Sequence, residues 1–140
     1  MGSGMAQRWQ DLADAVFAAW SSGDPDAPKD LLHPDAVLWD VASGRFEGWP
    51  AIRGFFGRAL DKWSDLQLAP DEYWFNDTSL VVHYVMSATV LDASWYGPDV
   101  VGRRWEVEVM SSLRFDDDLL VFEADFHDKG ARARSLGLAI

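Results

Sequence analysis

The sequence predicts a single α+β domain in which helices cover one face of a strongly curved, mostly antiparallel sheet. Apolar residues recur at helical spacing in the first part of the chain, whereas long strands separated by short polar turns are expected from residue 66 onward. Helices followed by antiparallel strands are typical of α+β folds. Because long strands twist and bend, we expect the helices and the sheet to enclose a cone-shaped pocket.

Three helices are expected before most of the sheet. Apolar side chains recur at helical spacing in residues 6–22, and the glycine of SSGD ends that pattern. The stretch DPDAPKDLLHPDA predicts a short second helix that ends before Pro34, because the α conformation is disfavoured for a residue that precedes proline. Residues 49–63 predict a third helix, in which Pro50 suits the first turn and Ile52 belongs to the apolar face.

Five strands are expected. AVLWDV predicts the first strand and SGRFEG the turn after it. The other four strands are expected in LQLAPDEYWFN, SLVVHYVMSATVLDAS, RRWEVEVMSSLRF and LLVFEADFHD. Since the 140-residue chain contains no repeat and no low-complexity linker, we expect one domain over residues 6–140, and we interpret MGSGM at residues 1–5 as an expression scar.

Composition argues against several classes of function. The formal net charge of −11 predicts no nucleic acid and no anionic membrane surface as a partner, since both need clustered Lys and Arg. With no Cys and three scattered His, the chain predicts no metal site, and without a phosphate-binding glycine loop we expect no cofactor. No apolar run reaches the roughly 18 residues of a membrane span and no signal segment is evident, so a cytoplasmic protein is expected.

Residues 121–128, VFEADFHD, alternate an apolar and an ionisable stripe, which a strand directs to opposite faces. If the preceding turn has two residues, Leu113 pairs with Phe122 and the ionisable stripe faces solvent. If the turn has three residues, Ser111 pairs with Glu123 and the ionisable stripe faces the pocket. Hydrophobic matching favours the first register, and a β-bulge that reverses the faces partway along the strand is a third alternative.

The expected order of elements, α-α-β-α-β-β-β-β, and the stretches LLHPDAVLWD, GRFEGWPAIRGFF and ADFHD resemble the nuclear transport factor 2-like superfamily. More narrowly, the chain resembles the branch of SnoaL-like polyketide cyclases, ketosteroid isomerases and limonene epoxide hydrolases. The resemblance covers nearly the whole chain from Ala6. It implies a cystatin-like, cone-shaped fold and a homodimer formed through the convex face of the sheet.

The resemblance also implies three catalytic candidates. Asp40 falls where ketosteroid isomerases have a general base, and apolar surroundings are expected to raise its pKa, although an Asp in a turn at the end of a strand is the structural alternative. ADFHD is similar to the ending of SnoaL-like cyclases whose first aspartate is catalytic, which implies Asp125, with His127 one pleat further on. Two carboxyls in one dry pocket would share a proton. Asp65 and Glu72 are alternative partners for Asp40.

Two reactions of related enzymes are not expected. Ketosteroid isomerases polarise a ketone with a tyrosine and a protonated aspartate, but Val16 or Phe17 stands at the tyrosine position and Ser111 at the aspartate position. The strand at 105–113 also lacks the Arg-x-Asp pattern of the epoxide hydrolases.

Eight Trp exceed what a core of this size requires, so some are expected to line the pocket and to favour a flat, apolar, cyclic ligand. In SLVVHYVM the even positions are apolar, which directs Tyr84 toward the pocket and His83 outward. The residues expected to contact the ligand are Val16, Phe17, Trp20, Trp39, Phe56, Trp63, Tyr84, Val109, Ser111 and Glu123.

These observations predict a cofactor-independent enzyme that uses carboxylates as general acid and base on a small, largely apolar molecule. Cyclisation, isomerisation, dehydration and hydrolysis all fit, with Asp40 as base, Asp125 as second acid–base group and His127 as a supporting donor. The alternatives are a ligand-binding or dimeric assembly protein of the same fold, and a protein-interaction module with a broad exposed apolar patch and no cavity.

Overall fold

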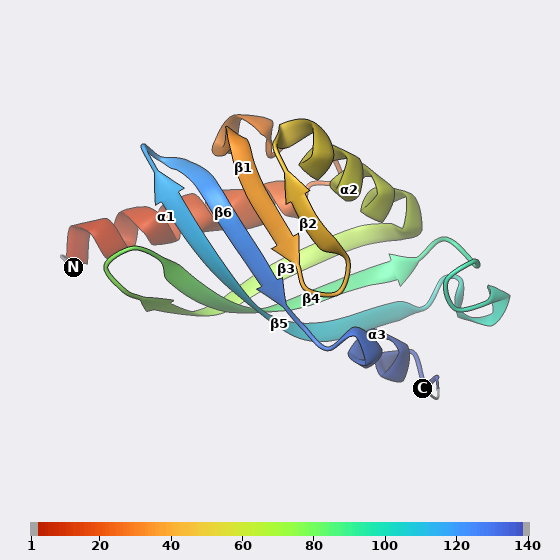
Figure 1. Cartoon of the computed structure of the whole chain (residues 1–140). Helices are drawn as coiled ribbons and strands as arrows, with labels where there is room; N and C mark the ends of the chain where they lie inside the picture. The colour runs from red at the N-terminus through yellow and green to blue at the C-terminus, as the bar shows by residue number, and fades with distance from the viewer. Residues whose placement is uncertain (1–2, 139–140) are drawn as a thin grey trace.

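The computed structural model describes residues 3–138 and shows two layers, a curved six-stranded sheet and the helices packed on it (Figure 1). The helices are α1 (Ser3–Trp20), α2 (Trp49–Lys62) and α3 (Lys129–Ser135). The strands are β1 (Leu32–Asp40), β2 (Gly44–Glu47), β3 (Trp63–Phe75), β4 (Leu80–Val90), β5 (Arg104–Asp116) and β6 (Leu119–Phe126). Single 3₁₀ turns lie at η1 (Lys29–Leu31) and η2 (Pro98–Val100). The predicted α+β class is confirmed.

The strand order is β2-β1-β6-β5-β4-β3, so the first and last long strands of the chain lie side by side in the middle of the sheet. β1 and β6 are parallel, and every other neighbouring pair is antiparallel. The sheet is therefore mostly antiparallel, as predicted. The parallel pair has a functional consequence, since it places the ends of β1 and β6 next to each other.

The helices close the space that the sheet leaves open. α1 packs on β3, while α2 contacts both β2 and β3, which are the two edge strands of the sheet. A helix that contacts both edges of a curved sheet covers its hollow, as Figure 1 shows for α2. One apolar cluster forms the core, in which Phe17, Ile52 and Trp105 are buried.

The structure differs from the sequence-based predictions about elements in three places. The second helix is only the single turn η1, and Pro34 lies inside β1, because proline is tolerated where a strand begins. The stretch SGRFEG was expected to be a turn but contains strand β2, which pairs with β1. No element was predicted beyond residue 128, where the chain forms α3, with Leu136 buried behind it.

Candidate active site

A cavity of about 370 Å³ lies between the sheet and α2, which is within the usual range for small-molecule sites. Aromatic rings form much of its wall, among them Trp20, Phe56, Trp63 and Trp105. Ionisable side chains from β1, from β6 and from the residue that follows β6 line one part of it, namely Asp40, Glu123, Asp125 and His127. The cavity therefore joins an apolar chamber to a cluster of groups that exchange protons.

A β-bulge in β6 directs Glu123 and Asp125 into the cavity. Near the turn, Phe115 pairs with Leu120, as expected for a two-residue turn. The register then shifts, so that Leu113 pairs with Glu123 and Ser111 with Asp125. Because an extra residue in one strand exchanges the faces of all later residues, the ionisable stripe is turned inward. The outward register that hydrophobic matching favours is therefore wrong beyond the turn, and the bulge alternative is confirmed.

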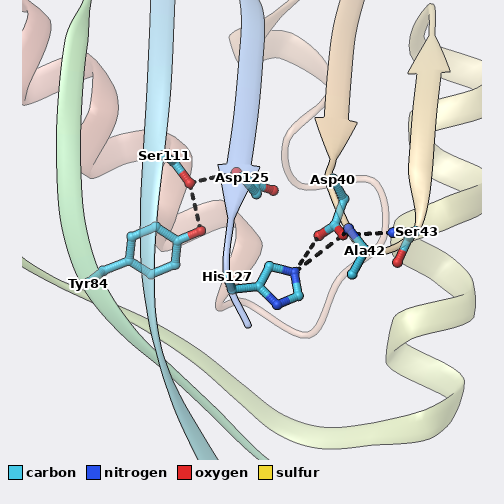
Figure 2. A network of polar contacts seen from close by, with 7 residues as sticks. All are labelled: Asp40, Ala42, Ser43, Tyr84, Ser111, Asp125 and His127. Carbon is cyan, nitrogen blue, oxygen red and sulfur yellow. Dashed lines mark hydrogen bonds and ion pairs between the residues drawn. The ribbon is translucent and has the colours of Figure 1, made fainter. Parts of the chain in front are cut away.

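Asp40 ends β1 and contacts His127, which follows β6. The His127 ring nitrogen Nε2 lies 3.3 Å from Oδ1 and 3.2 Å from Oδ2 of Asp40. Oδ1 also accepts hydrogen bonds from the backbone N–H groups of Ala42 and Ser43, at 2.9 and 3.0 Å (Figure 2). The side chains of His127 and Asp40 are only 5% and 11% exposed, so this contact is largely shielded from water.

The environment lowers the pKa of Asp40 from its ordinary value of 3.8. Burial acts to raise this pKa and is the largest single influence, but the contacts with His127, Ala42 and Ser43 together outweigh it. The expectation that burial would raise the pKa of Asp40 is therefore wrong. Asp40 accepts a hydrogen bond within the turn after β1, as the structural alternative predicted, and it also lines the cavity.

A chain of hydrogen bonds crosses three strands to Asp125. The Tyr84 hydroxyl lies 2.8 Å from Ser111 Oγ, and Ser111 Oγ donates to Asp125 Oδ1 at 2.6 Å. Figure 2 shows this chain beside the Asp40–His127 pair, with the two carboxyls on neighbouring strands. Tyr84 is buried and lines the cavity, whereas Ser111 is fully buried behind it. Ser111 therefore positions Asp125 rather than lining the cavity itself.

Glu123 and Asp125 interact and both have raised pKa values. Burial is the main cause for each, and the neighbouring Asp125 charge raises the pKa of Glu123 well above its ordinary value of 4.5. The hydrogen bond between them favours the neutral form of Glu123 and the ionised form of Asp125. Trp20 Nε1–H also donates to Glu123 Oε1 at 3.3 Å. The pair thus holds a proton on Glu123, close to Asp125.

The remaining residues predicted to contact a ligand divide into two groups. Trp20, Phe56, Trp63, Tyr84 and Val109 line the cavity. Val16 and Phe17 do not, because they are buried in the core, where the Phe17 ring packs 4.7 Å from that of Tyr84. Trp39 is 39% exposed and contacts Phe126 on the opposite face of the sheet, so its expected place in the pocket is wrong.

Other candidates lie away from the cavity. Asp65 pairs with Arg104 and Glu72 is exposed, so neither partners Asp40. His83 faces outward as predicted, with its two ring nitrogens 3.3 Å from Asp71 and 3.4 Å from Glu108. Within residues 3–138, no group of three or more His, Asp or Glu is arranged to hold a metal ion, and no helix is long and apolar enough to cross a membrane.

The cavity also contains basic residues that sequence reasoning did not select. Arg58 and Lys62 come from α2, and Lys129 and Arg132 come from the C-terminal segment. A signal for the C-terminal helix was present, because Asp128 caps α3 by accepting from Gly130 N–H at 2.9 Å and Gly137 follows the helix with a φ of 80°. An Asp followed by a Gly nine residues later could have predicted this helix.

Comparisons with known proteins agree with this fold. Residues 13–123 match the family model described as the SnoaL-like domain. The chain belongs to that family. None of the curated proteins matches it in sequence.

Solved structures of other proteins share the architecture. A putative polyketide cyclase from Xanthomonas campestris is 21% identical, with a TM-score of 0.82 over 93% of this chain and 97% of that one. IdmH, a putative polyketide cyclase from Streptomyces antibioticus, is 18% identical, with a TM-score of 0.80 over 92% and 98%. A ketosteroid isomerase-like protein from Catenulispora acidiphila, in complex with trimethylamine, is 18% identical, with a TM-score of 0.80 over 92% and 94%. At sequence identities this low, the structural matches establish the fold alone.

Proposed function

We propose that this SnoaL-like protein is a cofactor-independent enzyme that moves protons on a small, largely apolar cyclic molecule. The proposal rests on one observation: the cavity contains two pairs of acid–base residues, one with an ionised carboxylate and the other with a protonated carboxyl. Asp40 beside His127 remains ionised, while the Glu123–Asp125 pair retains a proton. Titratable groups whose surroundings separate their pKa values in this way are typical of acid–base catalysis.

The Asp40–His127 pair is the proposed base. An ionised carboxylate can only accept a hydrogen bond, so Nε2 of His127 must carry the hydrogen that points to Asp40. In neutral His127 the lone pair is then on Nδ1, which makes no hydrogen bond within the described residues and turns away from Asp40 in Figure 2. His127 would take the proton from the substrate, and Asp40 would hold the ring and stabilise the cation that forms.

The Glu123–Asp125 pair is the proposed acid. As His127 removes a proton from a carbon next to a carbonyl, the carbonyl oxygen gains negative charge. The proton held by the carboxyl pair neutralises that oxygen as the enol forms, and Tyr84 and Ser111 keep Asp125 in place. The enol carbon then takes a proton in an isomerisation, or attacks a second carbonyl of the same molecule in a cyclisation. The putative polyketide cyclases among the structural neighbours favour cyclisation of such polycarbonyl compounds.

Proton exchange at carbon tests this proposal without knowledge of the natural substrate. β-Tetralone, a flat bicyclic ketone with exchangeable protons beside its carbonyl, is incubated with the protein in D₂O, and the loss of its α-proton signal is followed by NMR. We expect exchange above the buffer rate, and a loss of about 10²–10⁴-fold in His127→Gln. The matched control is His83→Gln, which changes a histidine outside the cavity.

A non-catalytic ligand-binding protein is the second candidate, because aromatic rings make up so much of the cavity wall. Its signature is β-tetralone binding, observed as a change in Trp fluorescence, with exchange no faster than in buffer. That result would contradict the enzymatic proposal. Equal exchange rates in the wild type and in His127→Gln would contradict the assignment of the base.

A further inference from the structure

Basic residues gather in the cavity of a strongly acidic chain. The protein has 12 Lys and Arg and a net charge of −11, yet four of these 12 line this cavity: Arg58, Lys62, Lys129 and Arg132. Nothing in the proposed proton transfer uses them. Solvated basic side chains in an acidic protein are expected to lie close to carboxylates, so their convergence here requires a reason.

Aromatic rings, rather than carboxylates, hold two of these cations. The Lys62 ammonium lies 4.0 Å from the centre of the Trp95 ring. The guanidinium carbon of Arg132 lies 4.8 Å from the ring centre of Trp63 and 4.4 Å from that of Trp105. Within the described residues, none of the four cations forms a salt bridge. Cation–π contacts position these cations but leave their charge unneutralised.

Two buried donors at the same place also lack an acceptor. The Nε–H of Arg132 and the indole Nε1–H of Trp105 are buried without a hydrogen-bond partner. Leaving a buried donor unpaired costs about 1–3 kcal/mol. Since Trp105 is fully buried and both residues line the cavity, a ligand acceptor is the most direct means of satisfying them. The missing group is therefore an acceptor, and the surrounding charges favour an anionic one.

The rings that hold Lys62 and Arg132 are neighbours, since the centres of Trp95 and Trp63 lie 6.3 Å apart. Burial and the positive charges of Arg58 and Arg132 lower the pKa of Lys62, while Asp92 acts in the opposite direction. An anion between these groups would relieve the repulsion. The acidic groups of the site, Asp40, Glu123 and Asp125, belong to the ends of β1 and β6, so the cavity contains both an acid–base cluster and a basic cluster.

We propose that Arg132, Lys62 and the indole N–H of Trp105 form a carboxylate-binding subsite, and that the natural substrate is a cyclic or aromatic carboxylic acid. The inference rests on the proposed function, because it names the substrate class of the same cavity. The carboxylate would anchor one end of the molecule beside α3 and leave its carbonyl carbons to His127 and the Glu123–Asp125 pair. The planar guanidinium of Arg132 suits a planar carboxylate.

Binding of two matched ligands tests the subsite. β-Naphthoate and β-naphthamide share the same rings and differ in the charge of one substituent. Isothermal titration should show β-naphthoate binding roughly tenfold or more tightly than the amide, which corresponds to about 1.4 kcal/mol or more. The preference should shrink as salt is added, because screening weakens charge interactions. Equal affinity for the two ligands would overturn the inference.

Substitutions of the basic residues test where the carboxylate of β-naphthoate binds. Lys62→Met and Arg132→Met should each lose most of the preference for β-naphthoate and keep the affinity for the amide, and Arg132→Lys should recover part of it. Lys29→Met removes one exposed positive charge outside the cavity and should change neither affinity. If Arg132→Met does not fold, the ligand preference of Lys62→Met alone tests the subsite. Unchanged selectivity in Lys62→Met, or equal loss in Lys29→Met, would overturn the inference.

The two proposals fail in distinguishable ways. Binding is measured without turnover, so an absence of charge selectivity would contradict the carboxylate subsite and leave β-tetralone exchange intact. An absence of exchange in a protein that selects β-naphthoate would contradict the acid–base proposal instead.

Discussion

Asp40 and Asp125 are direct register partners on the parallel strands β1 and β6, and the pKa values of these neighbouring carboxyls move in opposite directions. Asp40 sits at the end of its strand, where two backbone N–H groups and His127 stabilise its charge. Asp125 lies beside a second buried carboxyl, Glu123, and can keep its charge only if that neighbour is neutral. Two neighbouring strands thus hold an ionised carboxylate, Asp40, beside a carboxyl pair that retains a proton.

Glu123→Gln is expected to stabilise the protein increasingly as the pH rises. The pKa of Glu123 is about 4.5 when unfolded and is raised by folding, so between these two values the folded protein binds more protons than the unfolded chain. The unfolding free energy of the wild type therefore falls as the pH rises through that window, and Gln cannot titrate. Urea denaturation across the window measures the difference. Asp125→Asn is the matched variant, and an equal gain there would contradict the placement of the proton on Glu123.

Asp40→Asn is expected to destabilise the protein by about 1.5–3 kcal/mol at neutral pH, because hydrogen bonds to a charged acceptor are lost. The pKa of Asp40 is lowered by folding, so its contribution is present above the unfolded value of 3.8 and is lost as the pH falls through the folded value. The difference between variant and wild type should shrink at the acid end of a urea denaturation series. A difference that is independent of pH would mean that the charge of Asp40 is not stabilised. Asp26→Asn, at an exposed ion pair with Arg53, is the control and should have a much smaller effect.

Ser111→Ala is expected to cost about 1–3 kcal/mol, because it leaves the buried hydroxyl of Tyr84 without its partner and removes a donor from Asp125. Tyr84→Phe should cost less, and the double variant less than the sum of the two single variants. Thermal unfolding of the four proteins measures this coupling. Strict additivity would show that the Tyr84–Ser111–Asp125 chain does not act as a unit.

A homodimer formed through the outer face of the sheet remains a proposal, and the structure offers a surface for it. Trp39, Met110 and Phe126 are 39%, 41% and 46% exposed, Met110 is the register partner of Phe126, and the Trp39 and Phe126 rings lie 5.5 Å apart. An exposed apolar cluster of this kind is typical of an interface. Light scattering should give the mass of a dimer for the wild type and of a monomer for Phe126→Lys.

The control for that experiment is Val101→Lys, which places the same charge on an exposed apolar residue of the loop between β4 and β5. It should remain dimeric. A monomeric wild type would contradict the proposed dimer, and a dimeric Phe126→Lys would place the interface elsewhere.

The sequence predicted the elements with strong periodicity and failed where the outcome depends on distant partners. Helical spacing in α1 and α2 and the alternation around Tyr84 were sufficient, because each pattern extends over several turns or strand residues. The face of Trp39 was not predictable from its apolar neighbours, since both faces of β1 carry large side chains: Leu38 points into the cavity and Trp39 packs outside on Phe126.

The site depends on two features that a single sequence encodes weakly. Hydrophobic matching gave the correct pairing of Phe115 with Leu120, but the following shift cannot be deduced from side-chain types, because the matching rule assumes an unbroken ladder. The pKa of Asp40 depends on backbone N–H groups of the following turn, and the apolar residues around it predicted only the opposing effect of burial.

The most direct test of the central claim is the titration of individual side-chain carboxyls by ¹³C NMR. The account predicts that the Glu123 carboxyl keeps the chemical shift of a protonated acid well above pH 4.5, while that of Asp40 keeps the shift of a carboxylate below pH 3.8. The Glu123 signal should titrate at its ordinary position in urea-unfolded protein. Ordinary titration of both Glu123 and Asp40 near pH 4 in the folded protein would contradict the claim that one cavity holds a protonated carboxyl and an ionised carboxylate side by side.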